Sequence, residues 1–216
     1  MRMVLPILIR KENRLIAGPL LFAAAAILYL ASNHFHIFRP RLLPLSRIDM
    51  AVPFVPQTVW LYVSEYIYFV VIYWSFRDIL NLNKFVYAVF AFLVGCVLVF
   101  WLWPTVISRD LFPLPENLDP LTRLVLTALR RVDSPANCFP SFHVGSVCLS
   151  CFIISSEGRW KFRFFLVWAI GICLSTLTLK QHYFVDVVSG FGLAVIFYYA
   201  FRAARFEFVP ITGRGR

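Results

Sequence analysis

The 216-residue sequence is poor in charge: 15% of its residues are charged, whereas 60% are apolar or aromatic. Soluble domains average about 25% charged and about 45–50% apolar residues. A soluble fold could not bury this excess of apolar surface, so the composition predicts an integral membrane protein. The sequence also lacks a Gly/Ser or Pro-rich linker between regions of different composition, which predicts one membrane domain over residues 1–216.

Acidic residues are scarce as well: 11 Asp and Glu stand against 21 Lys and Arg, a net charge of +10. The basic residues are spread along the flanks of apolar segments and form no basic stripe or base-reading motif, which argues against nucleic acid as a partner. Attraction to anionic lipid headgroups is the simpler interpretation. The oligomeric state cannot be read from the sequence.

The sequence has five cysteines, an odd number, mostly inside apolar runs, so it predicts no disulfide framework. Cys148 and Cys151 form a CxxC motif, but it lies within an apolar run and has no basic or Gly/Pro redox context. We interpret both residues as helix packing.

Six apolar segments are candidates for membrane-spanning helices, which need about 20 mostly apolar residues. They are Leu15–Ser32, Thr58–Phe76, Phe85–Ile107, Phe142–Ser156, Phe164–Leu179 and Phe184–Phe201. The predicted fold is therefore an all-α bundle of six transmembrane helices. The first segment also resembles a signal peptide, because basic residues precede it, but it is longer than the usual signal core of about 7–15 residues.

Six spans place both termini on one side of the membrane, and the distribution of Lys and Arg predicts which side. The tails and the second and fourth loops contain thirteen of these residues, and the opposite face contains eight. Because cytoplasmic loops are enriched in Lys and Arg, we expect cytoplasmic termini. The long loop 108–141 and the short link 180–183 then emerge together on the periplasmic, extracellular or lumenal side.

The long loop contains the sequence DPLTRLVLTALRRV, which begins at Asp119. Asp119 is a suitable N-cap, and Pro120 fits the first helical position. Leu121, Leu124, Val125 and Ala128 would share one side. We therefore expect a short amphipathic helix at the membrane interface between the third and fourth spans.

Three polar clusters converge on this non-cytoplasmic face: one in the loop helix, one at the start of the fourth span and one at the start of the sixth. Ser141, Phe142 and His143 open the fourth span, where unpaired N–H groups and the helix dipole favour a bound anion. His182 and Asp186 are four residues apart, so on a helix Asp186 can accept a hydrogen bond from one imidazole nitrogen and leave the other free to attack. A second histidine, His143, could then protonate a leaving group, which suits phosphoryl transfer.

Two readings from other classes remain open at this point. His143, His182 and Asp186 could together bind a metal such as zinc. Alternatively, the chain could be a transport bundle or another non-catalytic bundle whose polar residues line a path.

The motifs that carry these residues resemble those of the type 2 phosphatidic acid phosphatase superfamily. FPSFH at Phe139–His143 is similar to its second signature motif, and KQHYFVD at Lys180–Asp186 is similar to its third. The resemblance covers about residues 85–201, the expected catalytic core. It implies that His182 is the nucleophile that forms a phosphohistidine, that Asp186 is its partner, that His143 is the general acid, and that the chemistry needs neither cofactor nor metal.

The sequence departs from the family pattern in each motif. Phe142 replaces the usual glycine of the second motif, and Ser175 and Thr176 stand where the third motif has Ser-Arg. The first motif is absent, and Arg109 alone lies after the third span. We therefore expect Arg109 and Lys180 to supply the phosphate-binding charges, with Ser141, Phe142 and Asn137 also lining the phosphate site and Arg130 and Arg131 as weaker candidates.

These departures look more like the branch that contains inositol phosphorylceramide synthases and sphingomyelin synthases, which transfers a headgroup to an alcohol. The sequence thus predicts a membrane lipid phosphate phosphatase or phosphotransferase, with water or an alcohol as acceptor and an unidentified lipid as substrate. Glu65 lies inside the second span, either lining the site or making a structural hydrogen bond. His34 and His36 are interpreted as interfacial residues outside the site.

Overall fold

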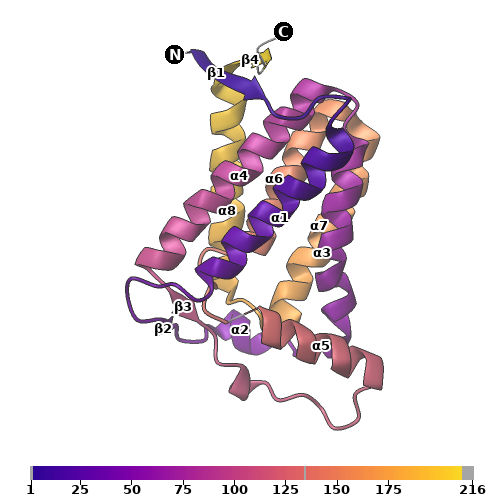
Figure 1. The fold of residues 1–216 in the computed structure, drawn as a ribbon. Coiled ribbons are helices and arrows are strands. Elements are labelled where there is room, and N and C mark those ends of the chain that lie inside the picture. The colour runs from indigo at the N-terminus through magenta and orange to yellow at the C-terminus, as the bar shows by residue number, and fades with distance from the viewer. Residues whose placement is uncertain (1, 134, 211–216) are drawn as a thin grey trace.

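The computed structural model describes residues 2–133 and 135–210, which form a bundle of helices with short strands at its two ends (Figure 1). The α-helices are α1 (Arg14–Ser32), α2 (Arg47–Ala51), α3 (Val59–Ser75), α4 (Ile79–Leu102), α5 (Pro120–Val132), α6 (Phe142–Ile154), α7 (Arg159–Thr178) and α8 (Phe184–Ala203). The 3-10 helices are η1 (Pro56–Thr58), η2 (Arg109–Leu111) and η3 (Ser155–Glu157). The strands are β1 (Arg2–Ile7), β2 (Arg41–Leu42), β3 (Thr105–Val106) and β4 (Arg205–Pro210).

Four helices of the described residues are long and apolar enough to cross a membrane: α1, α4, α7 and α8. The prediction of a helical membrane protein is thus supported, but that of six spans is confirmed for four segments only. The remaining two, α3 and α6, have 17 and 13 residues. The expected third span starts earlier than predicted, at Ile79, because the Asp78 carboxylate caps the helix by accepting the Leu80 N–H at 2.7 Å.

The short helix α6 lies at the centre of the bundle, where it packs against α3, α4, α7 and α8. Ten of its thirteen residues are buried. A helix surrounded on all sides needs no polar stripe, which explains why its mostly apolar sequence shows no amphipathic period. Because α6 begins inside the bundle, its first turn is enclosed by other helices.

The starts of α6 and α8 touch at two glycines. A Cβ atom on Gly190 would overlap the Ser141 carbonyl oxygen, and one on Gly145 would lie 2.9 Å from the Gly190 carbonyl oxygen. The close approach lets the Ser141 N–H donate a hydrogen bond to the Asp186 carbonyl oxygen at 3.0 Å. The two glycines therefore bring together the helix ends that carry the predicted catalytic residues.

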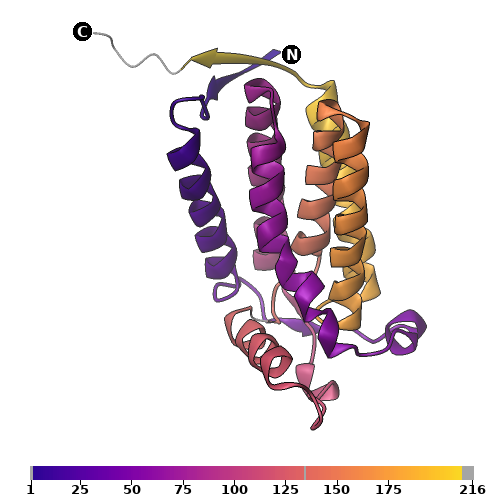
Figure 2. The same cartoon turned by 90° about the vertical axis from the view of Figure 1, so that its right-hand side faces the viewer.

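The two ends of the bundle have different structures, as Figures 1 and 2 show. At one end β1 pairs in parallel with β4, from Arg2 opposite Arg205 to Ile7 opposite Pro210, so both terminal segments lie together. At the other end β2 pairs with β3 beside α2 and α5. The all-α prediction missed these strands, which are too short and too separate in sequence to give a hairpin signal. The C-terminal tail ITGRGR lies outside the described residues.

Helix α5 begins at Pro120, as predicted, and the Asp119 carboxylate accepts the Thr122 N–H at 2.9 Å. The apolar side predicted from Leu121, Leu124, Val125 and Ala128 faces away from the bundle for the most part, which is compatible with a helix at the membrane interface. Thr122, Leu126 and Leu129 are buried, and α5 packs on α3, whereas Leu121 and Leu124 are exposed. The inward face was missed because Thr122 reads as polar in the sequence, although its hydroxyl accepts a hydrogen bond from the Trp60 indole at 3.1 Å.

Gly190→Ala should destabilise the protein, because its methyl group has to displace the backbone at Ser141. We expect a loss of about 1–3 kcal/mol in the free energy of unfolding, the usual cost of overpacking. Gly192→Ala is the matched control, since no atom lies within 4 Å of its Cβ position. It should be neutral or gain up to about 1 kcal/mol. Thermal unfolding in detergent checks both, and equal midpoints would contradict the proposed contact.

Candidate active site

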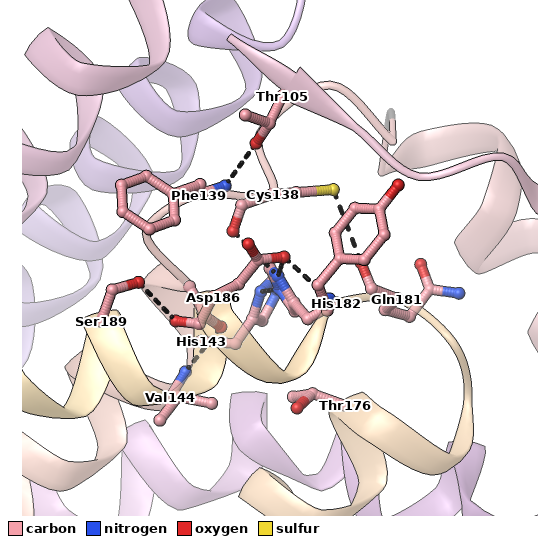
Figure 3. Close-up of polar contacts among 12 residues, drawn as sticks. Thr105, Cys138, Phe139, His143, Val144, Thr176, Gln181, His182, Asp186 and Ser189 are labelled. Atoms are coloured by element: carbon pink, nitrogen blue, oxygen red, sulfur yellow. Dashed lines mark hydrogen bonds and ion pairs between the residues drawn. The ribbon is translucent and has the colours of Figure 1, made fainter. Parts of the chain in front are cut away.

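Two imidazole rings meet near the end of the bundle that carries α2 and α5. His143 lies in the first turn of α6, and His182 lies in the link before α8. Nε2 of His182 is 3.4 Å from Nδ1 of His143, and the ring centroids are 5.6 Å apart (Figure 3). Both residues are buried, with exposed fractions of 5% and 8%. The structure thus brings together two histidines that are far apart in the sequence.

Nδ1 of His182 is hydrogen-bonded to the backbone. This nitrogen lies 3.0 Å from the Cys138 carbonyl oxygen, and a carbonyl can only accept, so Nδ1 carries the proton and Nε2 keeps its lone pair. The Asp186 carboxylate is further away, with Oδ2 3.5 Å from Nδ1. Oδ2 of Asp186 instead accepts the Tyr183 N–H at 2.8 Å at the start of α8. Asp186 therefore supports the ring electrostatically, while Cys138 is the closer acceptor.

The link that carries His182 wraps around the C-terminus of α7. Lys180 has a φ of 56°, the left-handed conformation that often ends a helix, and the Gln181 N–H donates to the Thr176 carbonyl oxygen at 3.1 Å. The Lys180 ammonium donates to the carbonyl oxygens of Asp49 and Val52, at 2.6 and 2.5 Å. Burial lowers the pKa of Lys180, an effect that the nearby Asp49 partly offsets. The positive charge of Lys180 therefore binds carbonyl oxygens at the end of α2.

His143 is surrounded by side chains from other elements. The Tyr62 hydroxyl lies 2.9 Å from Nε2 of His143 and 3.2 Å from Oδ2 of Asp133. The Tyr29 hydroxyl donates to the other Asp133 oxygen at 3.1 Å. Glu65 places Oε2 3.8 Å from Nε2 of His143 and accepts a hydrogen bond from the Ser146 hydroxyl at 3.3 Å, so it both lines the site and has a structural partner.

Tyr29, Tyr62 and Asp133 were missed by sequence reasoning. A tyrosine in an apolar span is usually packing or an interfacial residue, and Asp133 follows an amphipathic helix as an ordinary C-terminal residue. The only available signal was an unexplained carboxylate in the loop between two predicted site segments. Residue patterns within one segment cannot show that the hydroxyl groups of Tyr29 and Tyr62, from two different helices, both bind the Asp133 carboxylate.

The first turn of α6 is only partly available to an anion. The Ser141 N–H donates to Asp186, and the Ser141 hydroxyl accepts the Val144 N–H at 3.3 Å. Phe142 and His143 are then the first-turn donors left to face a ligand. The Phe142 ring stacks on Tyr29, with centroids 5.3 Å apart, so the residue at the family's glycine position forms an apolar wall of the site.

The other predicted phosphate ligands make contacts within the protein. The Arg109 guanidinium donates to the carbonyl oxygens of Arg130 and Asp133 and to Oε1 of Gln181, at 2.6, 2.7 and 2.7 Å. It therefore joins the end of α5 to the residue before His182. The Asn137 amide donates to the Ser32 hydroxyl at 2.7 Å. Their phosphate-binding roles stay predictions.

Two neighbouring cavities lie between α1, α3 and α4. The first, about 180 Å³ in volume, is lined by His143, Glu65 and Asp133 together with apolar side chains that include Phe142 and Ala25. The second, about 290 Å³, has an almost wholly apolar lining and shares Phe22, Ala25, Phe69 and Val89 with the first. An apolar path thus runs along α1 and ends at the general-acid candidate.

Among the described residues, a candidate metal-binding group comprises Cys138, His182 and Asp186, whose ligand atoms lie within 4.8 Å of one another. This set differs from the predicted one, because Cys138 replaces His143. Burial, together with the Asp186 carboxylate, raises the pKa of the Cys138 thiol. A metal would have to remove that proton before sulfur could coordinate it, so the donor set fits a metal poorly.

The apolar helices and the buried histidine pair define a helical membrane protein with a site suited to acid–base and nucleophilic chemistry. A family model described as the PAP2 superfamily matches residues 52–200, and the chain belongs to this superfamily. The matched region contains both histidines and Asp186. Neither the curated proteins nor the solved structures compared with the chain gave a match. The resemblance to the inositol phosphorylceramide and sphingomyelin synthase branch stays a prediction.

Arg109→Ala should destabilise the loop around the site, because three acceptors lose a charged donor. We expect a loss of about 3 kcal/mol in unfolding free energy, given about 1.5–3 kcal/mol for a hydrogen bond to a charged group. Arg123→Ala is the control, since Arg123 bonds only to carbonyls of the preceding loop at Pro115 and Glu116. It should cost less than about 1 kcal/mol. Equal unfolding midpoints in detergent would argue that Arg109 has no such structural role.

Proposed function

We propose that this protein is a membrane phosphatase or phosphotransferase that cleaves a lipid phosphate ester through a phosphohistidine on His182. The observation that carries the proposal is the meeting of Nε2 of His182 and Nδ1 of His143 at 3.4 Å, with the other nitrogen of His182 already bonded to Cys138. A free imidazole lone pair beside a second imidazole provides a nucleophile and an acid in one place.

As a phosphate enters, the two rings must separate from their resting 3.4 Å contact, because in-line displacement puts the attacking nitrogen and the departing oxygen on opposite sides of phosphorus. In the first step Nε2 of His182 then attacks phosphorus as the bond from phosphorus to the lipid oxygen breaks. The proton on Nδ1 of His143 passes to the departing oxygen, so the lipid leaves as an alcohol. His182 becomes a phosphorylated imidazole whose Nδ1–H remains bonded to the Cys138 carbonyl. Asp186, 3.5 Å from that nitrogen, offsets the positive charge that develops on the ring.

In the second step His143 takes a proton from water or from an acceptor alcohol, whose oxygen attacks phosphorus and breaks the N–P bond. Water gives free phosphate, whereas an alcohol gives a new phosphate ester. No contact in the structure chooses between them, so both acceptors stay in the proposal. The superfamily match supports phosphatase-type chemistry in general.

The apolar path along α1 supports a lipid as the substrate. A hydrocarbon chain in the two cavities would lie against Phe22, Phe69 and Val89 and place its phosphate at His143. We propose that α3 and α6 complete a six-span bundle, with cytoplasmic termini and the site on the periplasmic, extracellular or lumenal side. The charge bias of the loops supports this orientation.

The phosphate charge would be met by the protonated histidine and by the first-turn N–H groups of Phe142 and His143. Ser141 supports them by capping α6. Arg109, Lys180 and Asn137 would contribute directly only after releasing the protein acceptors described above. We therefore propose that in the resting arrangement these three residues position the site.

The His182→Ala variant should show no detectable turnover of a lipid phosphate and no phosphoenzyme, because the attacking nitrogen is gone. His143→Ala should still become phosphorylated by an aryl phosphate, whose leaving group needs no proton, and should accumulate the phosphoenzyme. Quenched incubation with labelled substrate, followed by mapping of the modified residue, measures both. Turnover that persists in His182→Ala, or that disappears in chelator and returns with zinc, would contradict the proposal.

Ala25→Phe should weaken binding of long-chain substrates, because Ala25 lines both cavities and a phenyl ring would fill the path. We expect KM for a long-chain phosphate to rise about tenfold, equivalent to about 1.4 kcal/mol, with a smaller change for a short-chain ester. Ala24→Phe is the matched control on the exposed side of α1. Equal KM changes in the two variants, or equal changes for both chain lengths, would place the lipid chain elsewhere.

A further inference from the structure

The hydroxyl group of Tyr62 lies between a carboxylate and an imidazole ring and has only one proton. It is 3.2 Å from Oδ2 of Asp133. It is 2.9 Å from Nε2 of His143 and 3.3 Å from Nδ1 of the same ring, so Nε2 is the nearer ring nitrogen. The second Asp133 oxygen accepts from the Tyr29 hydroxyl, so Asp133 is placed to act as an ionised carboxylate that only accepts. The Tyr62 proton therefore goes to Asp133, and the Tyr62 oxygen accepts a proton from Nε2 of His143.

This proton count fixes the tautomer of His143. With its proton on Nε2, the neutral ring has a lone pair on Nδ1, which faces His182. The Cys138 carbonyl has already fixed the proton of His182 on Nδ1, so its lone pair is on Nε2. Two lone pairs then face each other across 3.4 Å. One added proton between them converts this repulsion into a hydrogen bond, and on Nδ1 of His143 that proton is the one that the leaving group needs.

We propose that Tyr62 and Asp133 form a positioning relay that fixes the His143 tautomer and stabilises its protonated form as the general acid. The inference rests on the proposed function, because it concerns the acid of that reaction. Asp133 acts only through Tyr62, whose hydroxyl is 2.9 Å from Nε2 of His143 and 3.3 Å from the proton-donating Nδ1. Tyr62 fixes the ring through Nε2, and the Asp133 carboxylate balances the imidazolium charge from behind the tyrosine.

The groups around His143 come from several elements, and they are nearly all neutral or acidic. Tyr29 of α1 presents its ring edge, with centroids 5.7 Å apart. Tyr62 and Glu65 come from α3, Asp133 follows α5, and His182 precedes α8. Glu65, 3.8 Å from Nε2, is the second carboxyl group near the ring. Burial and the neighbouring His182 disfavour a proton on His143, and the Asp133 carboxylate opposes them. The loss of Asp133 should therefore make His143 give up its proton more easily.

Two substrates separate a role in acid catalysis from a role in folding. Dodecyl phosphate releases an alkoxide that must be protonated, whereas an octyl-substituted nitrophenyl phosphate releases a nitrophenolate, which is stable without a proton. For Tyr62→Phe and Asp133→Asn we expect kcat on dodecyl phosphate to fall about tenfold or more, since a positioned general acid contributes about 100-fold to 10,000-fold. On the aryl ester the fall should stay below about threefold.

Tyr68→Phe is the matched control, because Tyr68 is a buried tyrosine of the same helix α3 whose hydroxyl donates to the Val147 carbonyl oxygen at 2.9 Å. It should change kcat less than about threefold on either ester. The high-pH limb of the kcat profile for dodecyl phosphate should move to lower pH in Asp133→Asn, because the imidazolium has lost its counter-charge and releases its proton more easily. Tyr68→Phe should leave that limb in place.

The inference is overturned if Tyr62→Phe slows both esters equally, or if Tyr68→Phe reproduces its selectivity. If Tyr62→Phe does not fold, the Asp133→Asn variant tests the relay by itself, through its relative kcat on the two esters and through the shift of its pH profile. Thermal unfolding midpoints of all three variants accompany the kinetics. If the wild-type protein turns over neither ester, the proposed function is contradicted. If it turns over both, but the Tyr62 and Asp133 variants slow both esters equally, only the relay is contradicted.

Discussion

The close contact between the first turns of α6 and α8 is the constraint on which the site depends. Ser141 donates its N–H to the Asp186 carbonyl, and Gly190 leaves room for the Ser141 backbone. A larger residue at Gly190 would push the two turns apart and separate His143 from the link that holds His182. Backbone atoms thus fix the approach of two chain elements whose histidines are 39 residues apart in the sequence.

The link and the loops around His182 are held largely by backbone acceptors. Cys138 holds His182, Thr176 fixes the link before it, and the cations Arg109 and Lys180 bind carbonyl oxygens at helix ends. An unpaired buried charge is costly, so cations used in this way stabilise the loops that carry the histidines. His143, by contrast, has side-chain neighbours in Tyr62 and Glu65.

The sequence predicted the features that depend on local pattern. Apolar runs indicated the long helices, Asp119 and Pro120 predicted the start of α5, and the two signature motifs pointed to His143 and His182. Features that depend on contacts between distant segments could not be predicted. The Asp133 carboxylate has its partners on α1 and α3, and the Lys180 ammonium has its partners at the end of α2. Residue spacing determines which side chains share a helix face but not which helix lies opposite.

The parallel pairing of β1 with β4 has a mechanical consequence for the bundle. It fastens the segment before α1 to the segment after α8, so the chain forms a closed loop held by main-chain bonds at one end. Helix α1 is then tethered at that end, while its far end carries Tyr29 beside the site. At the same end Arg14 of α1 donates to the carbonyl oxygens of Tyr73 and Phe76 at the end of α3. Any widening between α1 and α3 should therefore be smallest beside the strands and largest at the end that carries His143.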